Sequence, residues 1–317
     1  MINFFRIRKF TYLISFTSIF VLGGGLIYKQ GGLSFGLEFT GGRSFIVSFQ
    51  ESPKIDTIKD QLKTAFDNQS TNVKTYGSTN VLRITTSYLL GQNDPQTNQA
   101  VQKILIDTLN KALPPKHHKA TKQNNNRFEI LSSSIIAPTV AGEETNASII
   151  ASILSLLMIL AYLLLRFRKF QYSLATVMAL IHDGLAVITA FVIARQFGIR
   201  YEINSYIVGS ILAGIGYSCN NSVVIITYFI NLLKESQIRD LKEVGNLAIT
   251  QTLSRTMITS GTTFIAVACL YIFGGEALRA FSFSMIVSII AGTYSSLFVI
   301  PLAYDLDRLT QKMRFAR

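Results

Sequence analysis

The sequence predicts a membrane protein with an all-α bundle of six transmembrane helices and one small α+β, ferredoxin-like domain outside the membrane. Three observations predict this fold class. The 317 residues have a mean hydropathy of +0.35 and are 49% hydrophobic, which is too apolar for an ordinary soluble domain. The apolar residues form six blocks that approach or exceed the roughly 20 residues needed to cross a bilayer. Polar composition returns over residues 28–144, a stretch long enough for one folded domain.

The first block resembles a secretory signal peptide in its basic start and in the run Gly23–Gly25 at its end. We favour an uncleaved anchor, because the apolar run is long for a signal and no small-x-small cleavage site follows it. The six expected spans are Phe10–Ile27, Ala147–Leu165, Tyr172–Ala194, Ile203–Leu232, Leu253–Phe273 and Phe281–Tyr304. The expected domains are residues 1–28 (N-terminal tail and first span), 29–144 (outer domain), 145–304 (the other spans) and 305–317 (basic cytoplasmic tail).

The net charge of +12 reflects membrane topology and not a nucleic-acid partner. Thirteen basic residues fall on the expected inner side of the membrane, whereas the short outer loops between the spans hold three, so the positive-inside rule predicts cytoplasmic N- and C-termini in a bacterial-type plasma (inner) membrane. The thirteen are Arg6, Arg8, Lys9, Arg166, Arg168, Lys169, Lys234, Arg239, Lys242, Arg308, Lys312, Arg314 and Arg317, and the three are Arg195, Arg200 and Arg279.

The outer segment alternates strand-like and helix-like patterns in the order of a split βαβ, ferredoxin-like unit. Its expected strands are Arg43–Gln50, Val73–Tyr76, Val81–Thr86 and Phe128–Ile136, with a turn at Gly77–Asn80 and helices at Ile55–Phe66 and Pro95–Leu113. The segment Pro114–Asn126 is expected to be a solvated loop, and its adjacent His117 and His118 lack a third ligand for a metal.

The segment from Lys234 to Thr250 is amphipathic. It is expected to be either a helix along the inner surface, with Ile238, Leu241 and Val244 on its buried side, or a plain hairpin connector. Cys219 and Cys269 both fall inside expected membrane helices and are interpreted as small core residues that form no disulfide.

The chain lacks the sequence signatures of catalysis. It contains no Walker A loop, no His-Glu-x-x-His, no Gly-x-Ser-x-Gly and no Cys-x-x-Cys. We therefore expect no enzyme, no cofactor and no metal site.

Polar residues inside the expected spans are the candidates for function, because an intramembrane charge costs at least about 2.5–3.5 kcal/mol. His182 and Asp183 can gain or lose a proton, whereas Arg255 cannot and would stabilise a carboxylate instead. With Asn220 and Asn221 they form a candidate proton path or polar seam between helices. Two structural alternatives stay open: an Asp183–Arg255 lock, and amides that only hold helices together.

Two groups of small residues accompany these candidates. Gly214, Gly216 and Ser218 in the fourth span, with Gly292 and Ser295 in the last, predict close helix packing. Outside the first span, the run Gly36–Gly42 permits tight turns at Gly41 and Gly42, while Glu38 and Thr40 can cap or pair.

These residues resemble the SecF family of the bacterial SecD–SecF complex of protein export, which is similar in fold to the resistance-nodulation-division transporters. No single motif is decisive, but six in the family's order are highly specific. The matching stretches are Gly36–Gly42, Pro138–Glu143, Ala179–Asp183, Gly216–Asn220, Gln251–Thr256 and Gly292–Ser296.

The fourth span departs from the family pattern. Where the family has an aspartate implicated in proton coupling, this chain has Asn221, which cannot titrate. The charged residues that usually follow are replaced by Thr227, Tyr228, Ile230 and Asn231, and Glu38 replaces a usual aspartate. Arg255 matches the family's arginine, which the resemblance implies works opposite a carboxylate of SecD.

The resemblance implies an accessory subunit that, with SecD, assists late preprotein export at the expense of the proton-motive force. Its implied partners are SecD, the Sec channel (SecY, SecE and SecG), further candidates YajC and YidC, the translocating preprotein and membrane lipid. Either the SecD carboxylate and Arg255 suffice for coupling, or this copy is a structural scaffold with weakened coupling. We favour the first, because an unpartnered intramembrane charge is costly. Half of a small-molecule exporter of the resistance-nodulation-division type is the remaining alternative.

Overall fold

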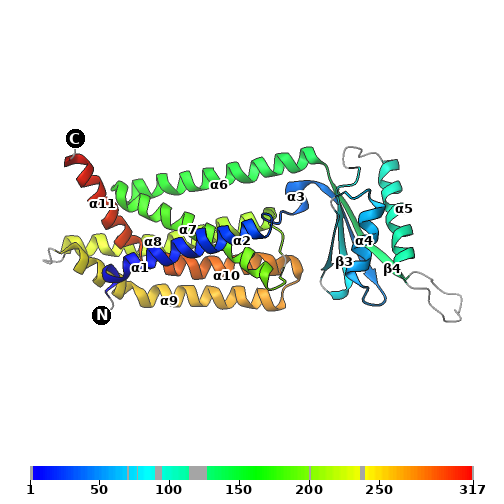
Figure 1. Cartoon of the computed structure of the whole chain (residues 1–317). Coiled ribbons are helices and arrows are strands. Elements are labelled where there is room, and N and C mark those ends of the chain that lie inside the picture. Colours follow the sequence, from blue (N-terminus) through cyan, green and yellow to red (C-terminus); the bar gives the residue numbers. More distant parts are fainter. Residues whose placement is uncertain are drawn as a thin grey trace. The chain divides into compact units, whose positions relative to one another are not determined.

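The computed structural model describes residues 3–69, 71–76, 78–89, 95–113, 127–199, 201–235 and 240–315. The chain forms two compact units, one of residues Phe35–Ala147 and one of Met1–Ser34 together with Ser148–Arg317 (Figure 1). The expected loop Pro114–Asn126, with its two histidines, lies outside the described residues, as do Arg200 and Ile238.

The unit Phe35–Ala147 is a small α+β domain with a four-stranded antiparallel sheet in the order β2-β3-β1-β4. Phe45 of β1 pairs with Ile84 of β3 and with Ser133 of β4. The elements are α3 (Leu37–Thr40), β1 (Gly42–Phe49), α4 (Ile55–Ala65), β2 (Thr71–Tyr76), β3 (Ser78–Thr86), α5 (Pro95–Ala112) and β4 (Phe128–Ile136).

The core of this domain lies between one face of the sheet and the two longer helices, α4 and α5 (Figure 1). Alternate residues of the central strands, such as Val47 and Leu82, are fully buried against Leu62 and Leu105 of the helices, as the period of two along a strand requires. The turn Gly77–Asn80 was expected to end at Asn80, and this bound is wrong. Strand β3 already begins at Ser78, which pairs with Tyr76 of β2.

The other unit is helical. Within the residues that the structure describes, six helices are long and apolar enough to cross a membrane, which confirms the expected number. They are Phe4–Lys29, Pro138–Phe167, Phe170–Gln196, Ser205–Glu235, Leu241–Phe273 and Leu278–Ser296. The first combines α1 (Phe4–Phe16), a π-helical stretch η1 (Thr17–Gly23) and α2 (Gly24–Lys29); the next four are α6 to α9 in chain order, and the last belongs to α10 (Glu276–Ser296).

The predictions for the segment Lys234–Thr250, a surface helix or a hairpin connector, are wrong for its second half, which belongs to the fifth span. Helix α9 runs without interruption from Leu241 to Phe273, so residues 241–250 form neither a separate surface helix nor a hairpin. The Asp240 side chain caps the helix by accepting a hydrogen bond from the Lys242 amide, and Val244 is buried in the bundle. At 1.5 Å per residue the helix is about 50 Å long, which exceeds the roughly 30 Å hydrocarbon core. Arg255 therefore lies near the middle of α9 and not in its first turns.

The sixth expected span, Phe281–Tyr304, matches the helix Leu278–Ser296 in its first part, but its expected end at Tyr304 is wrong because the range runs on into a second helix. Helix α10 ends at Ser296, and α11 (Val299–Phe315) begins after a short break. Pro301 lies in the first turn of α11, where its missing N–H is tolerated, but it could not continue α10. The expected tail from residue 305 is helical as far as Phe315.

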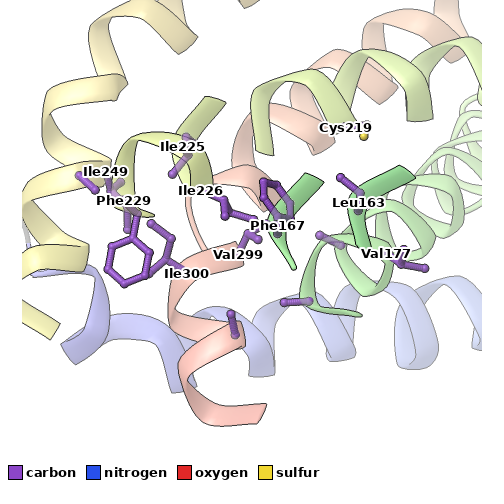
Figure 2. Close-up of a cluster of buried hydrophobic side chains, with 14 of the residues drawn as sticks. Leu163, Phe167, Val177, Cys219, Ile225, Ile226, Phe229, Ile249, Val299 and Ile300 are labelled. Atoms are coloured by element: carbon purple, nitrogen blue, oxygen red, sulfur yellow. The ribbon is translucent and has the colours of Figure 1, made fainter. Parts of the chain in front are cut away.

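The core of the helical unit is apolar and draws on α1, α6, α7, α8, α9 and α11 (Figure 2). It includes Cys219, as expected, whereas Cys269 is exposed on α9 and is not a core residue; both cysteines are free. The labelled members in the figure are Leu163, Phe167, Val177, Cys219, Ile225, Ile226, Phe229, Ile249, Val299 and Ile300.

Candidate polar site between the membrane helices

Asp183 lies at the centre of a buried hydrogen-bonded cluster that joins three helices. Its side chain is 2% exposed near the middle of α7, and its Oδ2 accepts hydrogen bonds from Ser218 Oγ of α8 (2.6 Å) and Ser295 Oγ of α10 (2.8 Å). His182 Nδ1 lies 3.0 Å from Asp183 Oδ1. The cluster satisfies a carboxylate that would otherwise be costly to bury.

Replacing Asp183 with alanine or with asparagine tests whether its side chain stabilises the bundle as a hydrogen-bond acceptor or through its negative charge. The change to alanine leaves the buried Ser218 hydroxyl without its acceptor, at a cost of about 1–3 kcal/mol, and leaves the Ser295 hydroxyl with only its 3.3 Å hydrogen bond to the Gly292 carbonyl. We therefore expect Asp183→Ala to lower the unfolding temperature of the full chain, measured in detergent. Asp183→Asn keeps an acceptor oxygen and should unfold much nearer the wild-type temperature; equal losses in the two variants would contradict the hydrogen-bonding role.

The same two helices, α8 and α10, approach each other closely at two glycines. A Cβ at Gly214 of α8 would lie 2.3 Å from Ser288 Cβ, and one at Gly292 of α10 would lie 2.6 Å from Ser218 Cβ. Small residues thus allow the backbones to come near enough for Ser218 and Ser295 to reach Asp183. Gly216 was expected to pack here, but it is exposed and nothing lies within 4 Å of the Cβ position.

Asn221 belongs to a second buried chain of hydrogen bonds. Its side chain is 3% exposed near the middle of α8, and its Nδ2 donates to Ser260 Oγ of α9 at 3.4 Å. Thr293 Oγ1 of α10 donates to the same Ser260 oxygen at 2.7 Å. Asn221 therefore links helices through neutral polar groups, as interhelical amides commonly do.

Asn220 and Arg255 lie apart from both buried clusters. Each is exposed on the surface of the helical unit, Asn220 on α8 and Arg255 on α9. Within the described residues the Arg255 side chain makes no hydrogen bond or ion pair, and no ion pair joins it to Asp183. The alternative of an Asp183–Arg255 lock is therefore wrong for this structure. The five expected seam residues divide into a buried group and an exposed pair.

A row of small residues runs along the exposed side of α8 and ends at Asn220. Gly209, Ala213, Gly216 and Asn220 are all exposed and follow the 3–4 residue spacing of one helix face, which we call the α8 stripe. No atom lies within 4 Å of the Cβ position at Gly209 or Gly216. Another helix could approach this stripe as closely as α10 approaches Gly214.

A groove of ≈ 460 Å³ opens on the His182 side of the buried cluster. His182 and Ser295 form part of its wall, and residues of α1, η1 and α7 form most of the rest. Its position leaves the His182 imidazole partly exposed while Asp183 behind it is buried.

The run Gly36–Gly42 forms a tight turn at the start of the α+β domain. Thr40 Oγ1 donates to the Gly36 carbonyl at 3.1 Å, and Glu38 lies in the first turn of α3. Gly41 and Gly42 have φ values of 69° and 145°, and a Cβ at Gly42 would lie 2.4 Å from Leu37 Cδ2. Both glycines are required by this backbone.

The serine and threonine partners of the site were not predicted from the sequence. Ser260 and Thr293 continue the chain of hydrogen bonds that begins at Asn221. Ser288 is the residue against which Gly214 packs. A signal was present in α10, where Ser284, Ser288, Gly292 and Ser295 follow the spacing of one helix face.

Comparison with known proteins identifies the family. The family model described as "Protein export membrane protein SecD/SecF, C-terminal" matches residues 116–308. The protein translocase subunit SecF of Rhodothermus marinus is 34% identical over 93% of this chain and 90% of its own length. This chain belongs to the SecD/SecF family of protein-export membrane proteins. The protein translocase subunit SecF of Haemophilus influenzae is 31% identical over 98% of this chain and 88% of its own.

The solved structure of SecDF from Thermus thermophilus, a translocon-associated membrane protein, has the same fold. It superposes with a TM-score of 0.77 at 23% identity and covers 97% of this chain, while this chain spans 38% of the SecDF chain. The SecD/SecF membership makes this protein a multi-pass membrane protein and an accessory translocase subunit, not an enzyme.

Proposed function

We propose that this chain pairs with SecD in the bacterial inner membrane and that the pair uses the proton-motive force to assist preprotein export through the Sec channel. The observation that carries the proposal is Arg255, a permanent charge near the middle of a membrane helix with no ion pair or side-chain hydrogen bond in the described part of the chain. Such a charge is too costly to face lipid, so another protein must supply its counter-charge.

The α8 stripe supports a partner helix packed against α8. Small residues let a second backbone come close without a hydrophobic driving force, and Asn220 offers it a hydrogen bond. A SecD helix packed along the stripe would bring a SecD carboxylate toward the Arg255 guanidinium. The SecDF structure, in which one chain is more than twice as long as the part matched here, supports such a pairing.

In this proposal Asn221 has a structural role, because it is buried and hydrogen-bonded to Ser260 rather than directed to the exposed side. The titrating group for protons is the SecD carboxylate opposite Arg255. Asp183 and His182 are a second titratable pair, which the groove beside His182 connects to the outside of the bundle. Proton passage would bias a conformational change of the outer domain that favours outward movement of the preprotein.

The proposed topology places both termini in the cytoplasm and the α+β domain outside, as the distribution of basic residues predicts. The sheet order β2-β3-β1-β4 and the βαββαβ element order support a ferredoxin-like outer domain. SecY, SecE and SecG are proposed partners, with YajC and YidC as further candidates.

Replacing Gly216 with valine tests the partner surface. The added side chain fills the α8 stripe but meets nothing within this chain, so we expect the variant to fold normally and to copurify with several-fold less SecD. Copurification from membranes at equal expression measures this, with Gly261→Val on α9, which also has open space, as the control. Undiminished SecD recovery would contradict the proposed surface, and recovery of a periplasmic adaptor instead of SecD would indicate a small-molecule exporter.

A further inference from the structure

Four basic side chains from separate segments gather at the end of the helical unit where α1 begins and α8 ends. They are Arg8 of α1, Lys169 at the start of α7, Lys242 in the first turn of α9 and Arg308 of α11. Residues far apart in the sequence thus form one positively charged surface region. It shares no residue with the buried clusters around Asp183 and Asn221.

Three of these cations surround a single aromatic ring. The Tyr304 ring centroid lies 5.7 Å from Lys242 Nζ, 5.7 Å from Arg308 Cζ and 6.0 Å from Arg8 Cζ. Cation–π attraction accounts for each contact singly. These contacts do not offset the repulsion among the three positive charges. Any two of the cations lie no farther apart than the sum of their distances to the Tyr304 ring centroid, so they repel one another.

Carboxylates balance only part of this charge. Arg8 Nε donates to Asp305 Oδ2 at 2.7 Å, which accounts for one cation. Asp307 lies in the wall of the neighbouring pocket and Asp240 accepts a hydrogen bond from the Lys242 amide, so among these described residues three acids accompany four bases. In the part of the chain that the structure describes, Lys169, Lys242 and Arg308 make cation–π contacts but no ion pair.

A pocket of ≈ 100 Å³ lies against the other side of this group and combines polar and apolar walls. Lys169, Tyr172 and Tyr304 line it together with Asp307. Phe229 and Ile300, which belong to the apolar core in Figure 2, supply much of its apolar wall. A ligand that suits both walls carries an anionic group and an apolar body.

We infer that the Tyr304 site, made of Arg8, Lys169, Lys242, Arg308 and Tyr304, binds the phosphate headgroup of an anionic phospholipid. Basic pockets between helices at the membrane surface have the charge and depth to hold such headgroups. The phosphate lies among the Lys242 and Arg308 side chains, and the glycerol and upper acyl chain contact the apolar wall. This inference does not depend on the proposed coupling to SecD.

The test measures lipid retention by native mass spectrometry on the full chain, purified from bilayers containing equal amounts of phosphatidylglycerol and phosphatidylcholine. We expect the wild type to retain phosphatidylglycerol several-fold over phosphatidylcholine. The double variant Lys242→Gln/Arg308→Gln should bring that ratio close to one. The control Arg6→Gln/Lys9→Gln removes two exposed α1 cations that make no contact with Tyr304, and it should keep the wild-type ratio.

A single variant, Lys169→Gln, keeps the test valid if the double variant does not fold, and it should reduce the ratio partially. An unchanged ratio in folded Lys242→Gln/Arg308→Gln or in Lys169→Gln would overturn the inference. Inorganic phosphate in millimolar excess forms a separate arm. If phosphate displaces the retained phosphatidylglycerol, the site recognises a free anion and the lipid assignment fails; if it does not, the apolar wall contributes as inferred.

Discussion

Replacing Gly214 with valine should strongly destabilise the helical unit. The new Cβ would lie 2.3 Å from both Cβ and Oγ of Ser288, so α8 and α10 must separate. Overpacking alone costs about 1–3 kcal/mol. Separation also moves Ser218 and Ser295 away from the Asp183 carboxylate, and each buried polar group that loses its partner adds about 1–3 kcal/mol. The total effect should exceed that of any other single substitution considered above.

A thiol-reactive fluorescent dye can follow this unfolding, because Cys219 is buried in α8 and becomes reactive only when the bundle opens. A Cys269→Ser background removes the signal of the exposed cysteine. Gly216→Val is the matched control on the same helix, since nothing lies within 4 Å of its Cβ position, and in the absence of SecD it should unfold near the wild-type temperature. Equal unfolding temperatures for Gly214→Val and Gly216→Val would contradict the close packing of α8 and α10.

Replacing Arg255 with methionine should reduce the proton-motive-force-dependent part of preprotein export by about an order of magnitude, because the change removes the side-chain charge that we propose pairs with the SecD carboxylate. Methionine is similar in length, apolar and compatible with a helix, so the fold should persist. Export into inverted membrane vesicles, at equal amounts of variant and wild-type subunit, measures the effect.

Two variants separate charge from shape in that experiment. Arg255→Lys keeps a positive charge and should retain much of the stimulation, although it cannot form a bidentate pair. Asn221→Asp restores an acid at the family's usual position, yet Asn221 is hydrogen-bonded to Ser260 inside the bundle. We therefore expect Asn221→Asp not to rescue Arg255→Met. Rescue would show that position 221 faces the proton path, and the structural role assigned to Asn221 would be wrong.

The fold was predictable to the extent that local hydrophobic pattern determines it. Long apolar blocks and alternating strands are encoded residue by residue, so the six spans and four strands were found from the sequence. The predicted bounds of the helices were wrong in two situations: where a helix continues through polar residues, and where an apolar run continues across a break between two helices. Residues 241–250 are polar enough to resemble a connector but are capped by Asp240 and packed through Val244. The break between Ser296 and Val299 interrupts an apolar run.

The site was predictable in residue type but not in pairing. Asp183, Asn221 and Arg255 were conspicuous because polar side chains are costly in a membrane. Which side of a helix each occupies depends on packing among several helices, and the sequence contains that only indirectly. Serine and threonine partners such as Ser260 and Ser295 were less visible, because a hydroxyl can bond to its own helix backbone and is common in spans.

We propose that Arg255 couples this subunit to the proton-motive force through a charge supplied by SecD. The most direct measurement is the export rate into inverted vesicles containing wild-type or Arg255→Met subunit, each with and without an ionophore that dissipates the proton gradient. We expect the ionophore to lower the wild-type export rate to that of Arg255→Met. The rate with the variant is already near background and should not change. An Arg255→Met subunit that keeps the full ionophore-sensitive stimulation would contradict the proposal.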